Sequence, residues 1–491
     1  MNPLRRLASQ TAIYGLSSVI GRFINYLLVP LYTYSFTTTE YGVVSEFYAY
    51  AGFLAVLLTF GMETGYFRFR EREDSDPALV YSTSLRFLLT VNIGFLAVVL
   101  ALDHLIAGAL QHGDHPEYVW WFALIVALDS VGAIAFARLR AENRALHFAG
   151  VKLIEIFVAV GLNLFLIAYC RPAYETAPDS WAGQLWNPAI GIGYIFLANI
   201  AASAVKLLLL APQLRGFTRG FDRELFARML RYSLPMMIIG MAGVINEMLD
   251  RAALKYLLPY DQETNLAQLG IYSACYKLAV LMSLFIQAFR YAGEPFFFAQ
   301  ARHKDAPQTY AAVLNYFTIF CAFIFLFVLA YIDLFKYFIG EPFREGLQVV
   351  PVLLMANLLL GIYVNLSIWY KLTDRTLLGA YVAGGGAVLT IALNLWWVPI
   401  MGYMGAAWAT LACYGAMTVV SYVLGRRYYP VPYDLRRMFG YLALAVALYA
   451  INAAISTATK LPSYVGGTLC LLAFSAVAYW ADGSRPRPRA S

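Results

Sequence analysis

Charged side chains interrupt several long apolar stretches of this 491-residue sequence. The densest group is NEMLDRAALKY, residues 246–256, which carries Glu247, Asp250, Arg251 and Lys255. In a helix, Glu247 lies four residues before Arg251, so the two can form an ion pair along one face, and Asp250 lies within reach of Glu247 three residues on. Lys255 lies near the end of the stretch and is expected to extend toward the aqueous interface. Charges at this depth mark ion or substrate pathways when they are not structural pairs.

Two further apolar stretches carry cations. Arg22 lies centrally in the first stretch, and Asn25 and Tyr26 follow at the spacing that places side chains on one helical face. Lys277 lies well inside a later stretch, whereas Arg290 lies near the end of that same stretch. Snorkelling and structural ion pairing are the alternatives for these cations. For Arg22 and Lys277, which lie too deep to reach the interface easily, a water-filled cavity is the favoured interpretation.

Carboxylates are also embedded in the apolar sequence. Glu63, Asp129 and Glu155 lie within separate stretches, and Glu294 follows Arg290 by about one helical turn. A buried carboxylate without a partner has a raised pKa and can carry a proton, and a cluster of carboxylates can bind Na⁺. Transport coupled to H⁺ or Na⁺ is therefore one interpretation of these residues. Simple neutralisation of nearby cations is the other.

The composition indicates which elements position these charges. The chain is 61% hydrophobic and 13% charged, whereas soluble proteins carry about 25% charged residues. Apolar segments long enough to form helical spans recur from end to end, so the sequence predicts an all-α polytopic membrane protein. Segmentation by hydropathy gives about fourteen transmembrane helices, near residues 8–34, 42–66, 84–110, 117–137, 148–170, 188–210, 232–257, 268–294, 309–332, 347–370, 376–399, 402–424, 437–457 and 462–480.

Lysine and arginine residues gather in alternate connections. Arg68, Arg70 and Arg72 follow the second predicted span, and the chain ends in a basic RPRPR segment. The intervening connections, such as FTTTE and QHGDHPE, are nearly free of basic residues. This asymmetry places both termini in the cytoplasm. The net charge of +7 is thus explained by topology, and the sequence predicts no nucleic-acid partner.

An internal repeat divides the chain. The segment beginning YGVVSEFYAY aligns with LGIYSACYKL, and NRALHFAGVK aligns with DRTLLGAYVA at nearly the same offset. The aligned pairs are Gly42 and Gly270, Ser45 and Ser273, Tyr48 and Tyr276, Gly65 and Gly293, and Asn163 and Asn394. Chance similarity between apolar segments is the weaker explanation, so we expect two parallel six-helix bundles. The expected boundaries are an N-terminal half at 1–215, a C-terminal half at 216–425, and two additional transmembrane helices with a basic cytoplasmic tail at 426–491.

Three segments of the sequence resemble one transporter family. ASQTAIYGLSSVIGRFINYLLVPLYTYSFTTTEYGVVS, RYSLPMMIIGMAGVINEMLDRAALKY and LGIYSACYKLA resemble the polysaccharide exporter and O-antigen flippases of the multidrug/oligosaccharidyl-lipid/polysaccharide flippase superfamily. The resemblance covers nearly the whole chain, but its motifs are diffuse. It implies a central cavity between two bundles that opens alternately to each side of the bacterial inner membrane. The implied substrate is a polyprenyl-pyrophosphate-linked oligosaccharide, the repeat unit of O-antigen, capsule or exopolysaccharide.

Such a headgroup is anionic and hydroxylated, so its passage requires cations, amides and aromatic faces in a wet cavity. The candidate residues for headgroup binding, taken from the cations within the apolar stretches and their polar neighbours, are Arg22, Asn25, Tyr26, Arg251, Lys277 and Arg290. Those assigned to ion coupling or charge pairing are Glu63, Glu247, Asp250 and Glu294. No catalytic residue, metal or cofactor is expected, apart from H⁺ or Na⁺ as a candidate coupling ion. The expected partners are the lipid-linked oligosaccharide, membrane lipids and other polysaccharide assembly proteins.

Other functions remain alternatives. A cation-coupled multidrug exporter of the same superfamily predicts twelve spans and an acidic, apolar cavity, and a lipid II-type flippase is a near relative. A membrane glycan polymerase or ligase would carry a large outer loop, whereas the longest one here, RPAYETAPDSWAGQLWN, is short. The histidines of HGDH, His112 and His115, have a metal-like spacing, but we interpret this segment as an exposed polar turn.

Overall fold

The computed structural model describes residues 19–72, 75–215, 220–301, 303–460 and 462–483. Every regular element in this part of the chain is a helix, and twelve helices there are long and apolar enough to cross a membrane. The predicted span at 188–210 is a shorter apolar helix, Gly193–Leu209, and the span at 8–34 is described only from residue 19 onward. The prediction of an all-α, multi-pass membrane protein is confirmed.

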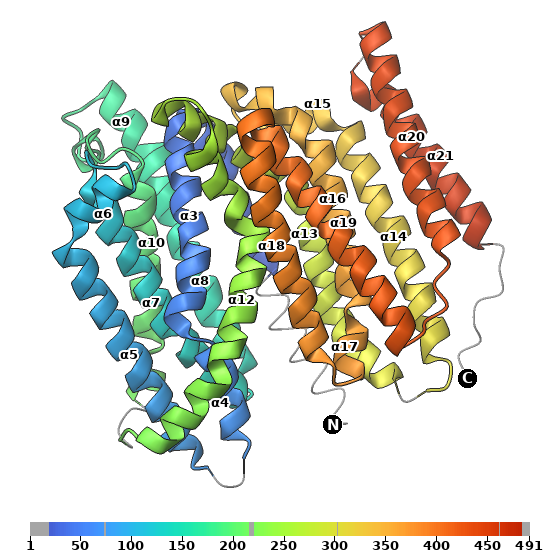
Figure 1. Cartoon of the computed structure of the whole chain (residues 1–491). Coiled ribbons are helices and arrows are strands. Elements are labelled where there is room, and N and C mark those ends of the chain that lie inside the picture. Colours follow the sequence, from blue (N-terminus) through green and yellow to red (C-terminus); the bar gives the residue numbers. More distant parts are fainter. Residues whose placement is uncertain (1–18, 73–74, 216–219, 302, 461, 484–491) are drawn as a thin grey trace. The chain divides into compact units, whose positions relative to one another are not determined.

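The chain divides into two compact units, Met1–Gly270 and Ile271–Ser491. The helices of the first unit are drawn from blue to green in Figure 1. Its α-helices are a stretch at residues 19–26, α2 (Leu28–Ser35), α3 (Thr38–Thr59), α4 (Met62–Arg70), α5 (Pro77–Ala101), α6 (Asp103–Ala109), α7 (Pro116–Ala141), α8 (Ala145–Asn163), α9 (Arg171–Thr176), α10 (Gly193–Leu209), α11 (Ala211–Leu214), α12 (Arg223–Leu257) and the start of α13 (Gln262–Gln300). A π-helical segment, Leu164–Cys170, connects α8 to α9. The boundaries expected from the sequence repeat stay a prediction.

The second unit contains the rest of α13 and the remaining helices (Figure 1). These are α14 (Ala306–Ala330), α15 (Ile332–Phe335), α16 (Val350–Leu366), α17 (Ile368–Leu372), α18 (Thr376–Met401), α19 (Tyr403–Tyr428), α20 (Leu435–Thr459) and α21 (Ser463–Gly483). Helix α19 packs against both α16 and α18, and α14 packs against both α20 and α21. The two C-terminal helices are therefore anchored on α14.

Short polar side chains determine where several helices begin. Thr37 and Glu40 form a reciprocal cap at the start of α3, in which each side chain accepts a hydrogen bond from the backbone N–H of the other. Asp76 caps α5, and Asp222 caps α12. These side chains satisfy backbone donors that have no partner within the first turn of a helix.

Glycines permit close helix packing within the first unit. A Cβ atom on Gly42 of α3 would lie 1.9 Å from the carbonyl oxygen of Leu266 on α13, and one on Gly270 would lie 2.0 Å from that of Thr38. The two glycines that the repeat aligns therefore meet at one helix crossing. Gly61, which has a φ of 63°, separates α3 from α4 and leaves no room for a Cβ atom beside the backbone of α12.

Candidate functional site

Three helices of the first unit enclose a buried ammonium group. Lys206 of α10 forms ion pairs with Asp129 of α7 and Glu155 of α8, and the Nζ–Oε1 distance to Glu155 is 2.8 Å. Lys152, about one turn earlier on α8, pairs with the other oxygen of Glu155 at 2.8 Å. The Lys206 side chain is 4% exposed and that of Asp129 is 47% exposed. The charges therefore extend from the bundle interior to its surface.

Uncharged polar groups continue this arrangement. The Ser203 hydroxyl donates to Asp129 at 2.6 Å, and the Asn199 amide donates to the hydroxyl of Tyr48 on α3 at 2.7 Å. Tyr48 is 43% exposed. Polar groups exposed at membrane depth face water-filled space rather than lipid. We refer to one set of residues as the polar network: Tyr48, Asp129, Lys152, Glu155, Asn199, Ser203 and Lys206.

The first predicted cation lies beside α8. Gly21 packs so closely on this helix that a Cβ atom there would lie 2.4 Å from Cδ1 of Ile156, the residue after Glu155. Arg22 and Asn25 are exposed, whereas Tyr26 is buried. The structure thus places two of the three predicted headgroup ligands of this stretch at the protein surface.

The charges of α12 form a local cluster. The Arg251 guanidinium lies 2.8 Å from the Asp250 carboxylate and donates to the backbone carbonyl of Glu247 at 2.7 Å. The Arg251 and Asp250 side chains are almost buried, and Glu247 is exposed. Arg251 therefore engages the Asp250 side chain and the main chain of Glu247, which lies one turn earlier.

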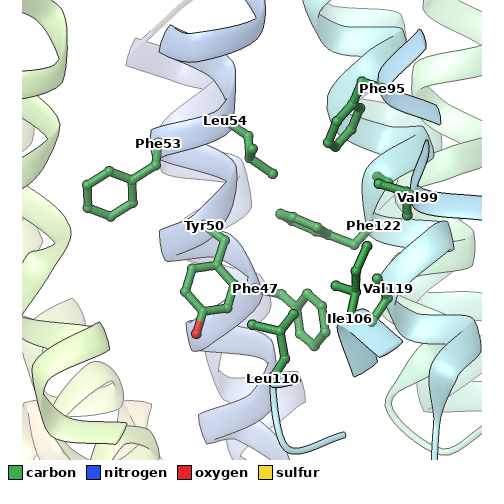
Figure 2. Close-up of a pocket in the computed structure, with 11 residues that line it drawn as sticks. Phe47, Tyr50, Phe53, Leu54, Phe95, Val99, Ile106, Leu110, Val119 and Phe122 are labelled. Atoms are coloured by element: carbon green, nitrogen blue, oxygen red, sulfur yellow. The ribbon is translucent and has the colours of Figure 1, made fainter. Parts of the chain in front are cut away.

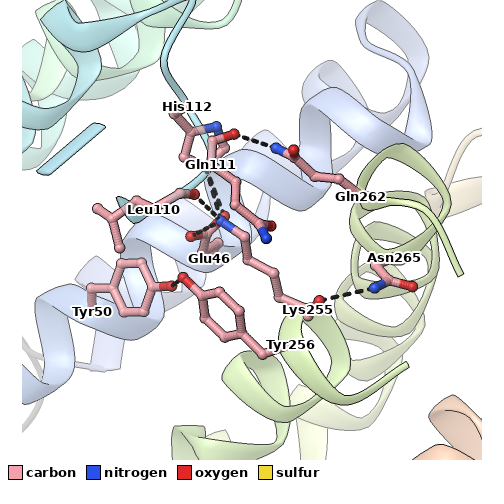
Figure 3. Close-up of polar contacts among 9 residues, drawn as sticks. All are labelled: Glu46, Tyr50, Leu110, Gln111, His112, Lys255, Tyr256, Gln262 and Asn265. Carbon is pink, nitrogen blue, oxygen red and sulfur yellow. Dashed lines mark hydrogen bonds and ion pairs between the residues drawn. The ribbon is translucent and has the colours of Figure 1, made fainter. Parts of the chain in front are cut away.

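Lys255, at the C-terminal end of the same helix, does not extend to the interface. Its Nζ atom lies 2.6 Å from Glu46 Oε1 on α3 and donates to the carbonyl oxygen of Leu110 at 2.5 Å, as Figure 3 shows. His112 Nε2 lies 2.9 Å from the other oxygen of Glu46 and 3.3 Å from Lys255 Nζ. We call Glu46, Leu110, His112 and Lys255 the buried clamp.

The buried clamp corrects two expectations from the sequence. Snorkelling was the wrong interpretation of Lys255, because Glu46 supplies an anionic partner inside the protein and both side chains are fully buried. An exposed turn was the wrong interpretation of His112, whose side chain is 8% exposed. Each correction arises from a contact between residues far apart in the sequence.

Neighbouring hydrogen bonds support the buried clamp. The hydroxyls of Tyr50 and Tyr256 lie 2.9 Å apart, and the Asn265 amide donates to the Lys255 carbonyl at 3.0 Å (Figure 3). Gln262 donates to the carbonyl of Gln111. These contacts join α12 and the start of α13 to α3 and the loop after α6. They explain why α12 belongs to the first compact unit.

Glu63 belongs to a different part of the first unit. It lies in the first turn of α4 and forms an ion pair with Arg140 of α7. Both side chains are about one-third exposed. This pair joins the short helix α4 to α7, so a carboxylate predicted for ion coupling or charge pairing has a basic partner.

The remaining predicted residues lie on α13 in the second unit. Lys277 is half-buried, and Arg290 is exposed. Arg290 lines a small crevice together with Asn365, Ser367 and Lys371. The side chain of Glu294 lies outside the described residues.

Two buried charged residues were not predicted from the sequence to belong to the site. Lys206 is a single cation in the run SAVKLLLL, and Glu46 is a single carboxylate in VVSEFYAY. Each has the same signal as the residues that were singled out, namely one charge within an apolar stretch. In the described part of the chain, no group of three or more His, Cys, Asp or Glu side chains is arranged to hold a metal ion.

Comparisons with known proteins agree with this architecture. A family model described as "Polysaccharide biosynthesis protein" matches residues 7–300. No curated protein matches the chain. Similar solved structures include a lipid II flippase in an inward closed conformation, with a TM-score of 0.68 and 12% identity, covering 95% of this chain and 99% of that one.

Two other similar structures are transporters of the multidrug/oligosaccharidyl-lipid/polysaccharide flippase superfamily. An inward-facing multidrug resistance transporter has a TM-score of 0.63 and 14% identity, covering 85% of this chain and 94% of that one. A transporter from Pyrococcus furiosus, described as having a binding pocket of reverse polarity, has a TM-score of 0.59 and 14% identity, covering 87% of this chain and 98% of that one. At these identities the likeness establishes a shared fold.

Proposed function

Because the chain belongs to the family of polysaccharide biosynthesis proteins and has the fold of this transporter superfamily, we propose that it is a lipid-linked oligosaccharide flippase. Its substrate is a polyprenyl-pyrophosphate-linked oligosaccharide, the repeat unit of O-antigen, capsule or exopolysaccharide. It moves the headgroup across the bacterial inner membrane by alternating access. Both chain termini lie in the cytoplasm.

The observation that carries this proposal is the polar network of the first unit. It presents the Tyr48 hydroxyl, the Asp129 carboxylate and the Lys152 ammonium at the surface of apolar helices. Exposed groups of this kind at membrane depth require water or a polar substrate beside them. A hydroxylated and charged headgroup satisfies that requirement, whereas an apolar cargo does not.

Different residues suit different parts of the headgroup. Arg22 is exposed beside α8, and Lys152 is more than one-third exposed on α8 itself, so these two cations bind the pyrophosphate. Tyr48 and Asn199 offer a hydroxyl, an aromatic face and an amide, which suit sugar hydroxyls. Lys206 forms ion pairs with two carboxylates. Its role is to position these carboxylates, and it does not contact the substrate.

Further residues and partners are candidates for ion coupling, headgroup binding and polysaccharide assembly. Glu63, Glu247, Asp250 and Glu294 stay the candidates for ion coupling or charge pairing. We assign charge pairing to Glu63 and Asp250, because each forms an ion pair with an arginine. Arg251, Lys277 and Arg290 are further candidate headgroup ligands. Other polysaccharide assembly proteins act before and after the flippase as its partners.

A transport assay tests the proposed headgroup site. Purified protein in vesicles is given a labelled polyprenyl-pyrophosphate oligosaccharide, and its appearance in the opposite leaflet is followed for Arg22→Ala and Lys152→Ala. We expect both variants to lose transport, while Arg223→Ala, which removes an exposed cation from the first turn of α12, retains it. Transport at the wild-type rate by both test variants would eliminate the cationic site.

A lipid II-type flippase is the second candidate. The observation that favours it is the extent of the structural match, which covers 95% of this chain. Both candidates carry a polyprenyl pyrophosphate, so the distinction lies in the headgroup. Adding unlabelled lipid II to the same vesicles separates them, because inhibition of oligosaccharide transport by lipid II supports the second candidate and lack of inhibition supports the first.

A further inference from the structure

A large apolar cavity lies within the first unit, between α3, α5, α6 and α7. Its volume is about 370 Å³, which falls in the range of small-molecule sites. Figure 2 shows Phe47 and Leu54 on the α3 side and Phe95, Val99 and Phe122 on the opposite side. The cavity is distinct from the polar network, with which it shares no lining residue.

The lining excludes water and polar ligands. Tyr50 is the one lining residue with a polar side-chain atom, and its hydroxyl is already bonded to Tyr256. A buried water requires about two to four polar partners, whereas apolar cavities stay dry and bind hydrocarbons. An empty space of this size would leave its walls without dispersion contacts. The matching ligand is therefore a hydrocarbon.

The surrounding surface indicates the source of that hydrocarbon. Ile93 and Val98 on α5 and Leu105 on α6 are each more than half exposed, and the helix that carries the first two is long and apolar enough to span a membrane. This face therefore contacts lipid chains. The lining residues Leu54, Phe95 and Ile106 are themselves only partly buried, so the cavity is continuous with the lipid-facing surface.

We propose that this cavity binds one acyl chain of a membrane phospholipid as a structural ligand. The surrounding bilayer supplies that chain, and the lining offers no group for a pyrophosphate head. The acyl chain fills the space between α3 and α6 and supports the buried clamp, because one cavity residue belongs to the clamp and another contacts it. Leu110 lines the cavity and accepts the hydrogen bond of Lys255. Phe47 lines the cavity, and its ring lies 5.3 Å from that of His112.

Photolabelling of the intact protein tests this proposal independently of any flippase activity. The protein is placed in phosphatidylethanolamine and phosphatidylglycerol vesicles that contain a trace of phospholipid with a diazirine on its acyl chain. After irradiation, mass spectrometry locates the labelled residues. We expect label on Phe95, Val99 and Phe122 of the cavity, and also on the exposed face of α5.

Two variants distinguish the cavity from general lipid contact. Ala123→Phe places a larger side chain in the cavity wall and should abolish cavity labelling, whereas Ile93→Phe on the exposed face of α5 should leave it unchanged. Val119→Phe provides a second filling variant if Ala123→Phe does not fold. Label confined to the exposed face in the wild-type protein overturns the proposal. Cavity labelling by a diazirine polyprenyl phosphate but not by the phospholipid also overturns it, since the occupant would then be a substrate chain.

Discussion

Lys255 and Glu46 form a fully buried ion pair, 2.6 Å long, between residues 209 positions apart in the chain. The pair joins α12 to α3, and the carbonyl of Leu110 and the ring of His112 complete its hydrogen bonding. Removing one member of a buried pair leaves the other charge uncompensated in a medium of low polarity. The pair therefore connects the C-terminal end of α12 to α3, and loss of either member alone should destabilise this connection.

Lys255→Met should destabilise the protein by about 3–5 kcal/mol, because Glu46 is left buried without its cation. Thermal unfolding in lipid nanodiscs measures the loss. The double variant Glu46→Leu with Lys255→Met should recover much of it, since neither charge then remains. An exposed residue is the control: Glu175→Gln, which removes the carboxylate partner of Arg171, should cost at most about 1 kcal/mol. An equal loss of stability in Lys255→Met and in the control variant would contradict a stabilising role of the buried clamp.

Gly42→Ala should prevent correct packing of α3 against the start of α13. The added Cβ atom would lie 1.9 Å from the carbonyl oxygen of Leu266, which is backbone and cannot rotate away. Gly94→Ala on α5 is the matched control, because nothing lies within 4 Å of its Cβ position. The control should be neutral or stabilising by about 0.5–1 kcal/mol. The yield of monodisperse protein and its melting temperature measure both effects, and a tolerated Gly42→Ala would refute the close crossing.

Asp333 should make the anchoring of α21 depend on pH. Partial burial raises the pKa of this carboxyl, but hydrogen bonds from the Ser463 backbone and hydroxyl and the nearby Lys336 ammonium outweigh it, so the pKa lies below its usual range. A group with a lowered pKa stabilises the folded state above its unfolded pKa, which is about 3.9, and this contribution is lost as the pH falls further.

We therefore expect Asp333→Asn to have a lower melting temperature than the wild type near pH 7. This difference in melting temperature should disappear below about pH 4. Thermal unfolding at several pH values measures this, and hydrogen exchange at the Ser463 amide reports the contact directly. Asp114→Asn, in an exposed loop position, is the control and should show no such pH dependence. A difference for Asp333→Asn that stays constant across this pH range would contradict the assignment.

Much of the fold follows from the sequence because it depends on local patterns. Apolar length determines each span, and residues such as Thr37 and Asp222 mark helix starts through their own side chains. The repeat also identified Gly42 and Gly270 as corresponding positions, although not that they contact each other. Hydropathy alone gave the wrong length for α10. The predicted span covers 23 residues, whereas the helix covers 17.

The site was less predictable because charges were judged without their partners. The distance of each residue from the ends of its apolar stretch predicted that Arg22 lies in a cavity and that Lys255 extends to the interface. The position of Lys255 instead depends on Glu46 of another helix. Likewise, the burial of Lys206 depends on Asp129 and Glu155, which come from two further helices. A single sequence shows the cost of a buried charge but does not show which distant residue offsets it.

We propose that the protein moves a polyprenyl-pyrophosphate-linked oligosaccharide, and one measurement tests this directly. Wild-type protein is reconstituted into vesicles whose two leaflets both carry a fluorescent form of this lipid, and a membrane-impermeant reagent that quenches the label is added outside. The account predicts that quenching proceeds beyond the outer-leaflet fraction in protein-containing vesicles, but not in empty ones or with an equally labelled phospholipid. Quenching that stops at the outer-leaflet fraction in protein-containing vesicles, under imposed H⁺ and Na⁺ gradients as well, would contradict the account.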